Sequence, residues 1–227
     1  MVIIQKIAQL LTGMNWLIIP AALFTIVLHE ISHGYVAFLL GDRTAKDAGR
    51  LTLNPIRHMD VIGLLCMVIF GFGWAKPVPV NPYYFKNRKG GMALVALAGP
   101  ASNLILAVFG LLLYRLVILI AGLSGVAALV ASSDVVYYLI LGFARFFSIF
   151  AMLNVGLAIF NLIPIPPLDG SKIVNAILPD RIYYQVMKYE QFGFLILLVI
   201  LNIPLLEGWI TAAQSWVFGA LCTLVGI

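Results

Sequence analysis

The chain has few charged residues. Of its 227 residues, 10% are Asp, Glu, Lys or Arg and 63% are hydrophobic, whereas roughly 25% of the residues of a soluble globular domain are charged. This composition excludes a domain for which water is the main solvent. Residues 90–114 and 146–168 carry no charge at all. Because a bilayer core about 30 Å thick needs about 20 apolar residues in a helix, such stretches predict transmembrane helices.

Cysteine is also scarce. Cys66 and Cys222 lie far apart in apolar surroundings, without the paired spacing of a disulfide framework or a thiolate metal site, so we expect both to be packing residues. Internal repeats and low-complexity stretches are absent too, and no small-residue cleavage site follows the first apolar stretch. We therefore expect a single membrane-embedded domain over residues 1–227, without a cleaved signal peptide.

The charges that are present lie in a few segments. The net charge is +5, with eight Lys or Arg residues between Arg43 and Lys89, three between Lys172 and Lys188, and none in residues 121–134. Basic loops near helix ends usually face the cytoplasm. We therefore interpret the positive charge as a sign of membrane topology, with residues 121–134 on the outer side, and we expect no nucleic-acid partner.

The hydrophobic pattern predicts an all-α polytopic membrane protein. It indicates an interfacial helix over residues 1–14, and membrane spans over residues 16–40, 92–120, 135–163, 191–206 and 208–227.

The segment 61–82 is expected to differ from the spans. Its fifteen uncharged residues from Val61 to Ala75 are too few to cross a bilayer, and the glycines and prolines that follow exclude a helix interior. We predict a re-entrant segment that contains a short strand or hairpin. Non-helical backbone at membrane depth must be buried in protein or line a wet cavity.

The pentapeptide His29-Glu-Ile-Ser-His33 lies in the last third of the first predicted span. On a helix, two histidines four residues apart project from one face and can bind a single metal ion, while Glu30 can take a proton from a water molecule at the metal. The pattern can arise by chance, and a helical histidine is usually structural. Three ionisable side chains within a span are costly, however, and this cost favours a functional site.

A catalytic zinc site needs a third protein ligand. Asp134 falls on the outer side, whereas Asp169 follows the proline-broken end of span 135–163 on the same side as His33, so we expect Asp169 to be the ligand. Zn²⁺, two neutral imidazoles, a carboxylate and a hydroxide sum to zero charge, which is the least costly combination in a low dielectric. The alternative is a turn or helix cap at Asp169-Gly170, and both roles are compatible.

Other polar residues receive structural interpretations. We expect His58 to be an exposed loop residue and Asp60 to cap the re-entrant helix. Asn103 and Asn161 lie in predicted spans, where a buried amide can join two helices by hydrogen bonds. For Asn103 we favour that role.

These motifs resemble those of the site-2 proteases. His29-Glu-x-x-His33 is followed by Asn161-x-x-Pro164-x-Pro166-x-x-Asp169-Gly170. Two shorter segments are similar to that family as well: Gly49-Arg-Leu-Thr-Leu-Asn-Pro55 and Gly99-Pro-x-x-Asn103. The resemblance covers roughly residues 20–190, and spaced metal motifs make it specific.

The resemblance implies an intramembrane zinc endopeptidase with one Zn²⁺ per chain. The metal ligands would be His29, His33 and Asp169, Glu30 would be the general base, and Asn161 would stabilise the oxyanion. For Asn161 a helix-joining role weighs equally. The substrate would be a membrane protein cut within or near a transmembrane helix. Independently of the resemblance, an extended substrate segment could pair with the strand-like region between Gly71 and Val80, as in β-strand addition.

We expect an integral membrane protein of a prokaryotic cell membrane, embedded in the lipid bilayer, with its active site toward the cytoplasmic side. Many relatives insert a peptide-binding domain or append a nucleotide-sensing domain, and we expect neither in this chain. Two other classes remain as alternatives. A metal transporter would carry metal-binding residues on several spans, and an inactive membrane scaffold would have no need of Glu30.

Overall fold

The computed structural model describes residues 16–60, 63, 75–179, 182, 193, 197, 199 and 203–227. The helices in these residues are α2 (Ile18–Leu39), α3 (Thr44–Asp47), α5 (Arg88–Ala121), α6 (Ser124–Ser132), α7 (Asp134–Asn161), α8 (Asp169–Ile177) and α11 (Pro204–Val225), with 3₁₀ turns η1 (Pro55–Arg57) and η2 (Pro82–Tyr84). The described residues contain no β-strand. The predicted all-α class is therefore confirmed. The expected interfacial helix 1–14, Cys66 and most of the expected span 191–206 lie outside the described residues.

Four helices are long and apolar enough to cross a membrane: α2, α5, α7 and residues Leu205–Val225 of α11. At most 33% of the apolar window of each helix is buried within the protein. The remaining apolar surface needs lipid around it, because water would make its exposure costly. The chain is thus an integral membrane protein.

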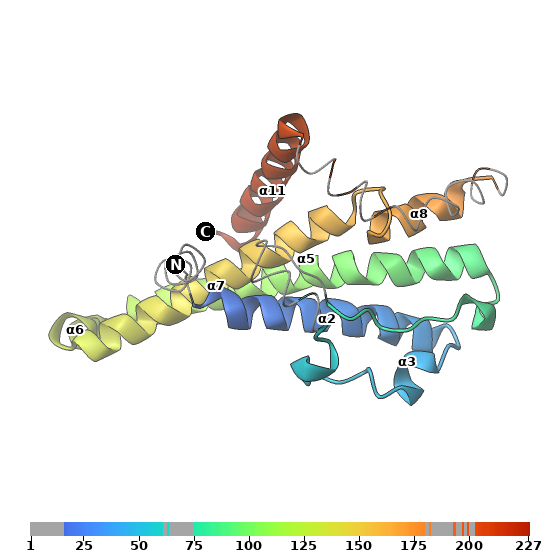
Figure 1. Cartoon of the computed structure of the whole chain (residues 1–227). Helices are drawn as coiled ribbons and strands as arrows, with labels where there is room; N and C mark the ends of the chain where they lie inside the picture. The colour runs from blue at the N-terminus through green and yellow to red at the C-terminus, as the bar shows by residue number, and fades with distance from the viewer. Residues whose placement is uncertain are drawn as a thin grey trace, which may run out of the picture.

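Three of these helices form the core of the molecule. In Figure 1, α2, α5 and α7 run side by side along one direction, whereas α11 leans away at a steep angle. Contacts join α5 to α2, α7, α8 and α11. Fully buried alanines lie on the facing surfaces, among them Ala21 and Ala37 of α2, Ala107 of α5 and Ala151 of α7. Such small residues let membrane helices approach closely, which brings polar groups of different helices within reach of one another.

The ends of two helices differ from the sequence-based boundaries. α5 begins at Arg88 because the Asn87 side chain accepts a hydrogen bond from the Gly90 N–H and caps the helix. α11 begins at Pro204, a residue well suited to a first helical turn, so the boundary expected between the spans 191–206 and 208–227 is wrong. At its other end, Gly226 adopts a left-handed φ of 79°, and Arg115 of α5 donates to the Val225 carbonyl. Arg115 therefore caps a neighbouring helix.

The segment after α2 is tied down by a buried carboxylate. Asp42 has no solvent exposure. Its Oδ1 accepts hydrogen bonds from the backbone N–H of Thr44, at 2.9 Å, and from the Thr44 hydroxyl. Its Oδ2 accepts from the Asn81 N–H at 2.6 Å. One side chain thus joins the end of α2 to the segment that precedes α5.

The expected strand is not formed in its described part. Ala75 makes a single antiparallel bridge with Met59, and residues 76–80 have no regular secondary structure. Pro77 and Pro79 explain this, because proline has no N–H to donate to a ladder. Residues 71–74 lie outside the described part of the chain.

Two loop residues before this segment were also assigned roles from the sequence. The expectation that His58 is exposed is wrong: the side chain is 1% exposed, and its Nε2 lies 2.8 Å from the Thr52 carbonyl oxygen. A carbonyl oxygen can only accept, so this nitrogen must carry a proton and donate. The Asp60 carboxylate accepts from the Gly63 N–H at 2.9 Å, as a helix cap does. The helix it was expected to cap is not part of the described chain.

Asp42→Ala is predicted to destabilise the fold. The substitution leaves the N–H groups of Thr44 and Asn81 without their acceptor, at a cost of about 1–3 kcal/mol for each buried group. Unfolding of the purified protein in detergent micelles measures the effect. The matched control is Asp47→Ala, because Asp47 is exposed and its 3.8 Å ion pair with Arg43 contributes about 0–1 kcal/mol. Equal stability of the two variants would contradict the role given to Asp42.

Candidate metal centre

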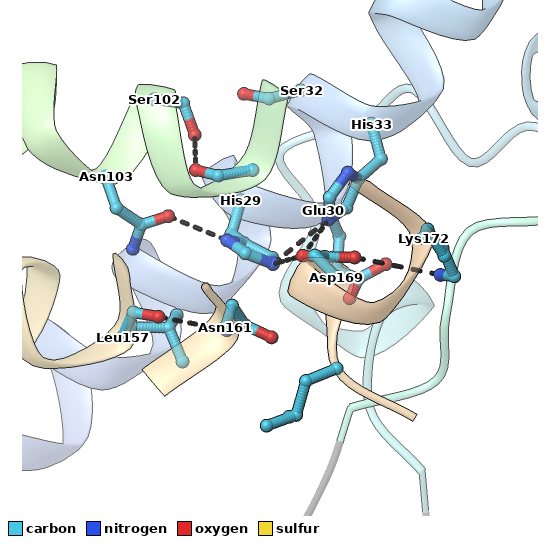
Figure 2. Close-up of polar contacts among 12 residues, drawn as sticks. His29, Glu30, Ser32, His33, Ser102, Asn103, Leu157, Asn161, Asp169 and Lys172 are labelled. Atoms are coloured by element: carbon cyan, nitrogen blue, oxygen red, sulfur yellow. Dashed lines mark hydrogen bonds and ion pairs between the residues drawn. The ribbon is translucent and has the colours of Figure 1, made fainter. Parts of the chain in front are cut away.

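Helix α2 supplies two imidazoles that point toward the same spot. His29 and His33 are 5% and 9% exposed, and their four-residue spacing places both rings on one face of the helix. Their Nε2 atoms lie 3.0 Å apart. Figure 2 shows both rings directed at the carboxylate of Asp169.

The carboxylate comes from the first turn of α8. Asp169 Oδ2 lies 3.3 Å from His29 Nε2 and 3.1 Å from His33 Nε2. The close packing of α8 on the end of α7 requires a glycine at position 170: a Cβ there would lie 2.3 Å from the Leu162 carbonyl oxygen. Asp169 is thus the first residue of α8 and faces both imidazoles. The N-cap of this helix is Leu168, and no side chain caps it, so the helix-cap alternative for Asp169 is not supported.

The protonation of His33 follows from its partner. Its Nδ1 lies 2.7 Å from the Val95 carbonyl oxygen, which can only accept a hydrogen bond. His33 Nδ1 must therefore carry the proton. In the neutral ring, Nε2 is then left with a lone pair directed at His29 and Asp169.

The same reasoning applies to His29 through two asparagines. The Asn154 Nδ2 donates to the Phe150 carbonyl oxygen at 2.8 Å and to the Thr25 hydroxyl at 2.9 Å, which fixes the orientation of this amide. Its Oδ1 therefore accepts from Asn103 Nδ2, at 3.2 Å. The Asn103 Oδ1 then faces His29 Nδ1 at 2.7 Å, so that this nitrogen is the donor and Nε2 again keeps its lone pair.

Three electron-pair donors thus face one another in a buried place. The possible ligand atoms of His29, His33 and Asp169 all lie within 4.8 Å of one another. Asp169 Oδ2 is buried and has no hydrogen-bond partner within the described protein. Mutually facing lone pairs repel unless a cation joins them. Two imidazole nitrogens and one carboxylate oxygen are a typical ligand set for a catalytic Zn²⁺, which leaves a fourth position open.

The carboxylate is ionised, as a metal ligand must be. Burial alone would raise the pKa of Asp169. In the metal-free protein, hydrogen bonds that the imidazoles of His29 and His33 donate when a proton sits on Nε2, together with the ammonium group of Lys172, hold that pKa well below its ordinary range. Lys172 Nζ lies 3.7 Å from Oδ1, the oxygen that faces away from the imidazoles.

Glu30 lies beside this cluster, next to the first histidine on α2. It is partly buried, and its Oε2 accepts a hydrogen bond from the backbone N–H of Val78 at 2.9 Å. An ionised carboxylate in this position can act as a proton acceptor within reach of the open side of the cluster.

Asn161, the last residue of α7, has a local partner. Its Nδ2 donates to the Leu157 carbonyl oxygen, one turn earlier in the same helix, at 3.0 Å. The amide therefore joins no second helix in this structure, and no hydrogen bond links it to the three-residue cluster in the described residues. Its role stays a prediction.

Sequence reasoning missed three residues of the site. Asn103 does join helices as expected, but it also orients His29, and Asn154 and Gly99 received no role. A Cβ at Gly99 would lie 2.5 Å from atoms of both imidazole rings, so the glycine makes room for them. The one feature of the sequence that could have pointed to Asn154 is its position, because it is a polar residue within the uncharged stretch 146–168.

The fold and the site together define a polytopic membrane metalloenzyme. Comparison with known proteins specifies the class. Residues 17–201 match the model of peptidase family M50, so the chain belongs to this family, which is that of the site-2 proteases. The chain is therefore a membrane-embedded zinc metalloprotease. No solved structure gives a significant match.

Several curated bacterial proteins are similar to the chain. YwhC of Bacillus subtilis (strain 168), named as a candidate zinc metalloprotease, is 43% identical over 195 residues, which cover 86% of this chain and 84% of the relative. Rip2 of Mycolicibacterium smegmatis (strain ATCC 700084 / mc(2)155), named in the same way, is 31% identical over 212 residues, covering 91% and 74%. Rip2 of Mycobacterium tuberculosis (strain ATCC 25618 / H37Rv) is 29% identical with the same coverage.

Gly99→Ala is predicted to abolish metal binding. The added methyl group would displace both imidazoles, because it would lie 2.5 Å from each ring. We expect the zinc content of the purified protein, measured by elemental analysis, to fall from about one to near zero per chain. Gly142→Ala is the control, since a Cβ at Gly142 meets no atom within 4 Å. Full zinc occupancy in Gly99→Ala would refute the cluster geometry.

Asn154→Leu is predicted to weaken metal binding without abolishing it. Without the Asn154 Oδ1, the Asn103 amide can turn, and His29 loses the partner that fixes its tautomer. Loss of such an outer hydrogen bond typically costs 10- to 100-fold in metal affinity. Competition with a chelator of known affinity measures the change. An unchanged affinity would show that His29 needs no orientation by the two asparagines.

Proposed function

We propose that the chain hydrolyses peptide bonds within or near the transmembrane segments of membrane proteins, with one Zn²⁺ held by His29, His33 and Asp169 and with Glu30 as general base. One observation carries the proposal: three potential metal ligands converge at a buried point, and a carboxylate stands one residue away from the first of them. Membership of peptidase family M50 supports the same reaction.

The chemistry divides between the metal and the chain. A bound Zn²⁺ supplies a Lewis acid that polarises the scissile carbonyl and lowers the pKa of a water molecule. Glu30 accepts the proton of the attacking water and returns it to the leaving amine. The single carboxylate would neutralise half of the metal charge, which lowers the cost of holding the ion between apolar helices.

Asn161 is proposed as a donor to the oxyanion that forms at the scissile carbonyl. This role requires its Nδ2 to leave the Leu157 carbonyl, which it does by a rotation of its own side chain. Preorganised donors of this type stabilise the developing charge strongly. The helix-joining alternative for Asn161 lacks a partner on a second helix among the described residues.

The proposed substrate is a membrane protein, cut from the cytoplasmic side. The cluster lies toward the end of the bundle where α2 ends, α5 begins and α8 packs (Figure 1), and the basic loops of the chain gather at this end. A site that is built from membrane-spanning helices suits a substrate that is itself a transmembrane helix. The relatives named above are bacterial, which supports a prokaryotic cell membrane.

Transport of metal ions is less well supported. A transporter needs successive metal-binding groups along a path through the membrane. In the described residues, His29, His33 and Asp169 are the one group of three or more potential ligands. An inactive scaffold would have no need of a general base beside the first ligand.

Glu30→Gln is predicted to retain zinc and lose proteolysis. Gln has the size of Glu but cannot accept the proton, and a general base contributes about 10²- to 10⁴-fold to the rate. Cleavage of a single-pass membrane substrate in proteoliposomes and zinc per chain are measured together. Glu207→Gln, the same change at an exposed residue of α11, is the control. Cleavage by Glu30→Gln at the wild-type rate would refute the proposal, and zinc flux into vesicles without cleavage would favour transport.

A further inference from the structure

Residues 76–81, which we call the strap, are fixed at their first residue by two hydrogen bonds. The Lys76 N–H donates to the His58 carbonyl oxygen at 2.8 Å. The Lys76 carbonyl oxygen accepts from Arg50 Nη2 at 2.7 Å. Both backbone groups of Lys76 are thus bonded to the loop that contains the Gly49–Pro55 motif, a motif that the zinc cluster does not use.

The last residue of the strap is fixed as well. The Asn81 N–H donates to the fully buried Asp42 carboxylate at 2.6 Å. The two anchors hold the strap at both ends, and Pro77 and Pro79 restrict the backbone between them. The segment is therefore short, stiff and tied to the loops that follow α2.

The middle of the strap lies directly on α2. Val78 is buried, and its N–H donates to Glu30 Oε2 at 2.9 Å. Because Pro77 and Pro79 have no N–H, Val78 supplies the one backbone donor of residues 77–79. Gly34, one turn after Glu30, makes this contact possible: a Cβ at Gly34 would lie 2.8 Å from Val78 Cγ1.

We propose that the strap is a positioning element for the general base, and that Arg50 is the positioning residue that holds it in place. The Val78 amide fixes one oxygen of Glu30, so that the other is free to face the zinc cluster. Arg50 acts at a distance, through Lys76. The inference rests on the proposed role of Glu30, and it extends that role to a loop with no metal ligand.

The choice of Arg50 follows from its burial and its bond. Its side chain is 7% exposed, and it is the side chain that hydrogen-bonds the strap at Lys76. Arg57 of the same loop is exposed. Holding a catalytic group in its productive geometry can be worth a large rate factor, because a misplacement of about 1 Å can cost 10²-fold.

The strap also affects the expected pairing with an extended substrate. In residues 77–80 only the two valines have an N–H that a substrate strand could bond. The Val78 N–H is already bonded to Glu30. A substrate strand that paired with Val78 would have to break this bond. The contact therefore favours a role of Val78 in orienting the base over a role as a docking edge.

Two independent changes test the strap in the full-length protein with zinc bound. Arg50→Met removes the anchor at Lys76, and Gly34→Ala inserts a methyl group between α2 and the side chains of Val78 and Leu51. For both we expect zinc per chain to stay near one, KM for a single-pass membrane substrate to change by less than about twofold, and kcat to fall by about 10- to 100-fold. Arg50→Lys, which keeps a donor for the Lys76 carbonyl, should recover part of kcat.

The controls are Arg57→Met and Gly142→Ala, the same substitutions at an exposed arginine and at a glycine with open space around it. Unchanged or increased kcat in both test variants would overturn the proposal, and an increase would identify the strap as an inhibitory contact. Loss of zinc in both would also overturn it, by showing that the strap supports the ligands. If Arg50→Met does not fold, Gly34→Ala decides alone.

Glu30→Gln in the same assay separates the two proposals. If this variant is inactive while both strap variants have normal kcat, the base assignment stands and the strap proposal fails. If Glu30→Gln cleaves normally, both fail.

Discussion

The structure depends on an electrostatic requirement at one buried point. Two imidazole nitrogens and a carboxylate oxygen face one another with their lone pairs, and each is held there by a bond on its other side or by its own helix. Without a cation these groups would repel, and their burial between apolar helices makes that repulsion costly. A divalent metal satisfies all three at once. The arrangement of the surrounding helices can be understood as the means of bringing the three groups together.

That arrangement relies on residues with little or no side chain. Gly99 leaves room for the two imidazoles, Gly170 lets α8 pack on the end of α7, and Gly34 lets the strap lie on α2. At each of these positions a Cβ would lie within 3 Å of another group. The glycines of the sequence motifs thus have a steric explanation: each removes a volume that a functional group or a backbone segment occupies.

Hydrogen bonds from surrounding residues orient the side chains of the metal cluster. Asn154 orients Asn103, which orients His29, and this chain of amides joins α7, α5 and α2. Such outer contacts set the tautomer and the ring orientation of metal ligands. Next to the histidines on α2, the strap engages Glu30 through Val78. The ligands and the base, although neighbours in the sequence, are therefore held by different parts of the chain.

The sequence by itself determined the membrane class and the bounds of three long helices to within a few residues at each end. It also determined that two histidines share one face of a helix. Helix length and four-residue spacing are local properties of the chain. It also pointed to Asp169 through topology. Only the tertiary structure decided that His58 is buried, that Asn103 bonds His29 and that Val78 bonds Glu30. These contacts join residues 48 or 74 positions apart, and no local periodicity encodes which polar group will face which across packed helices.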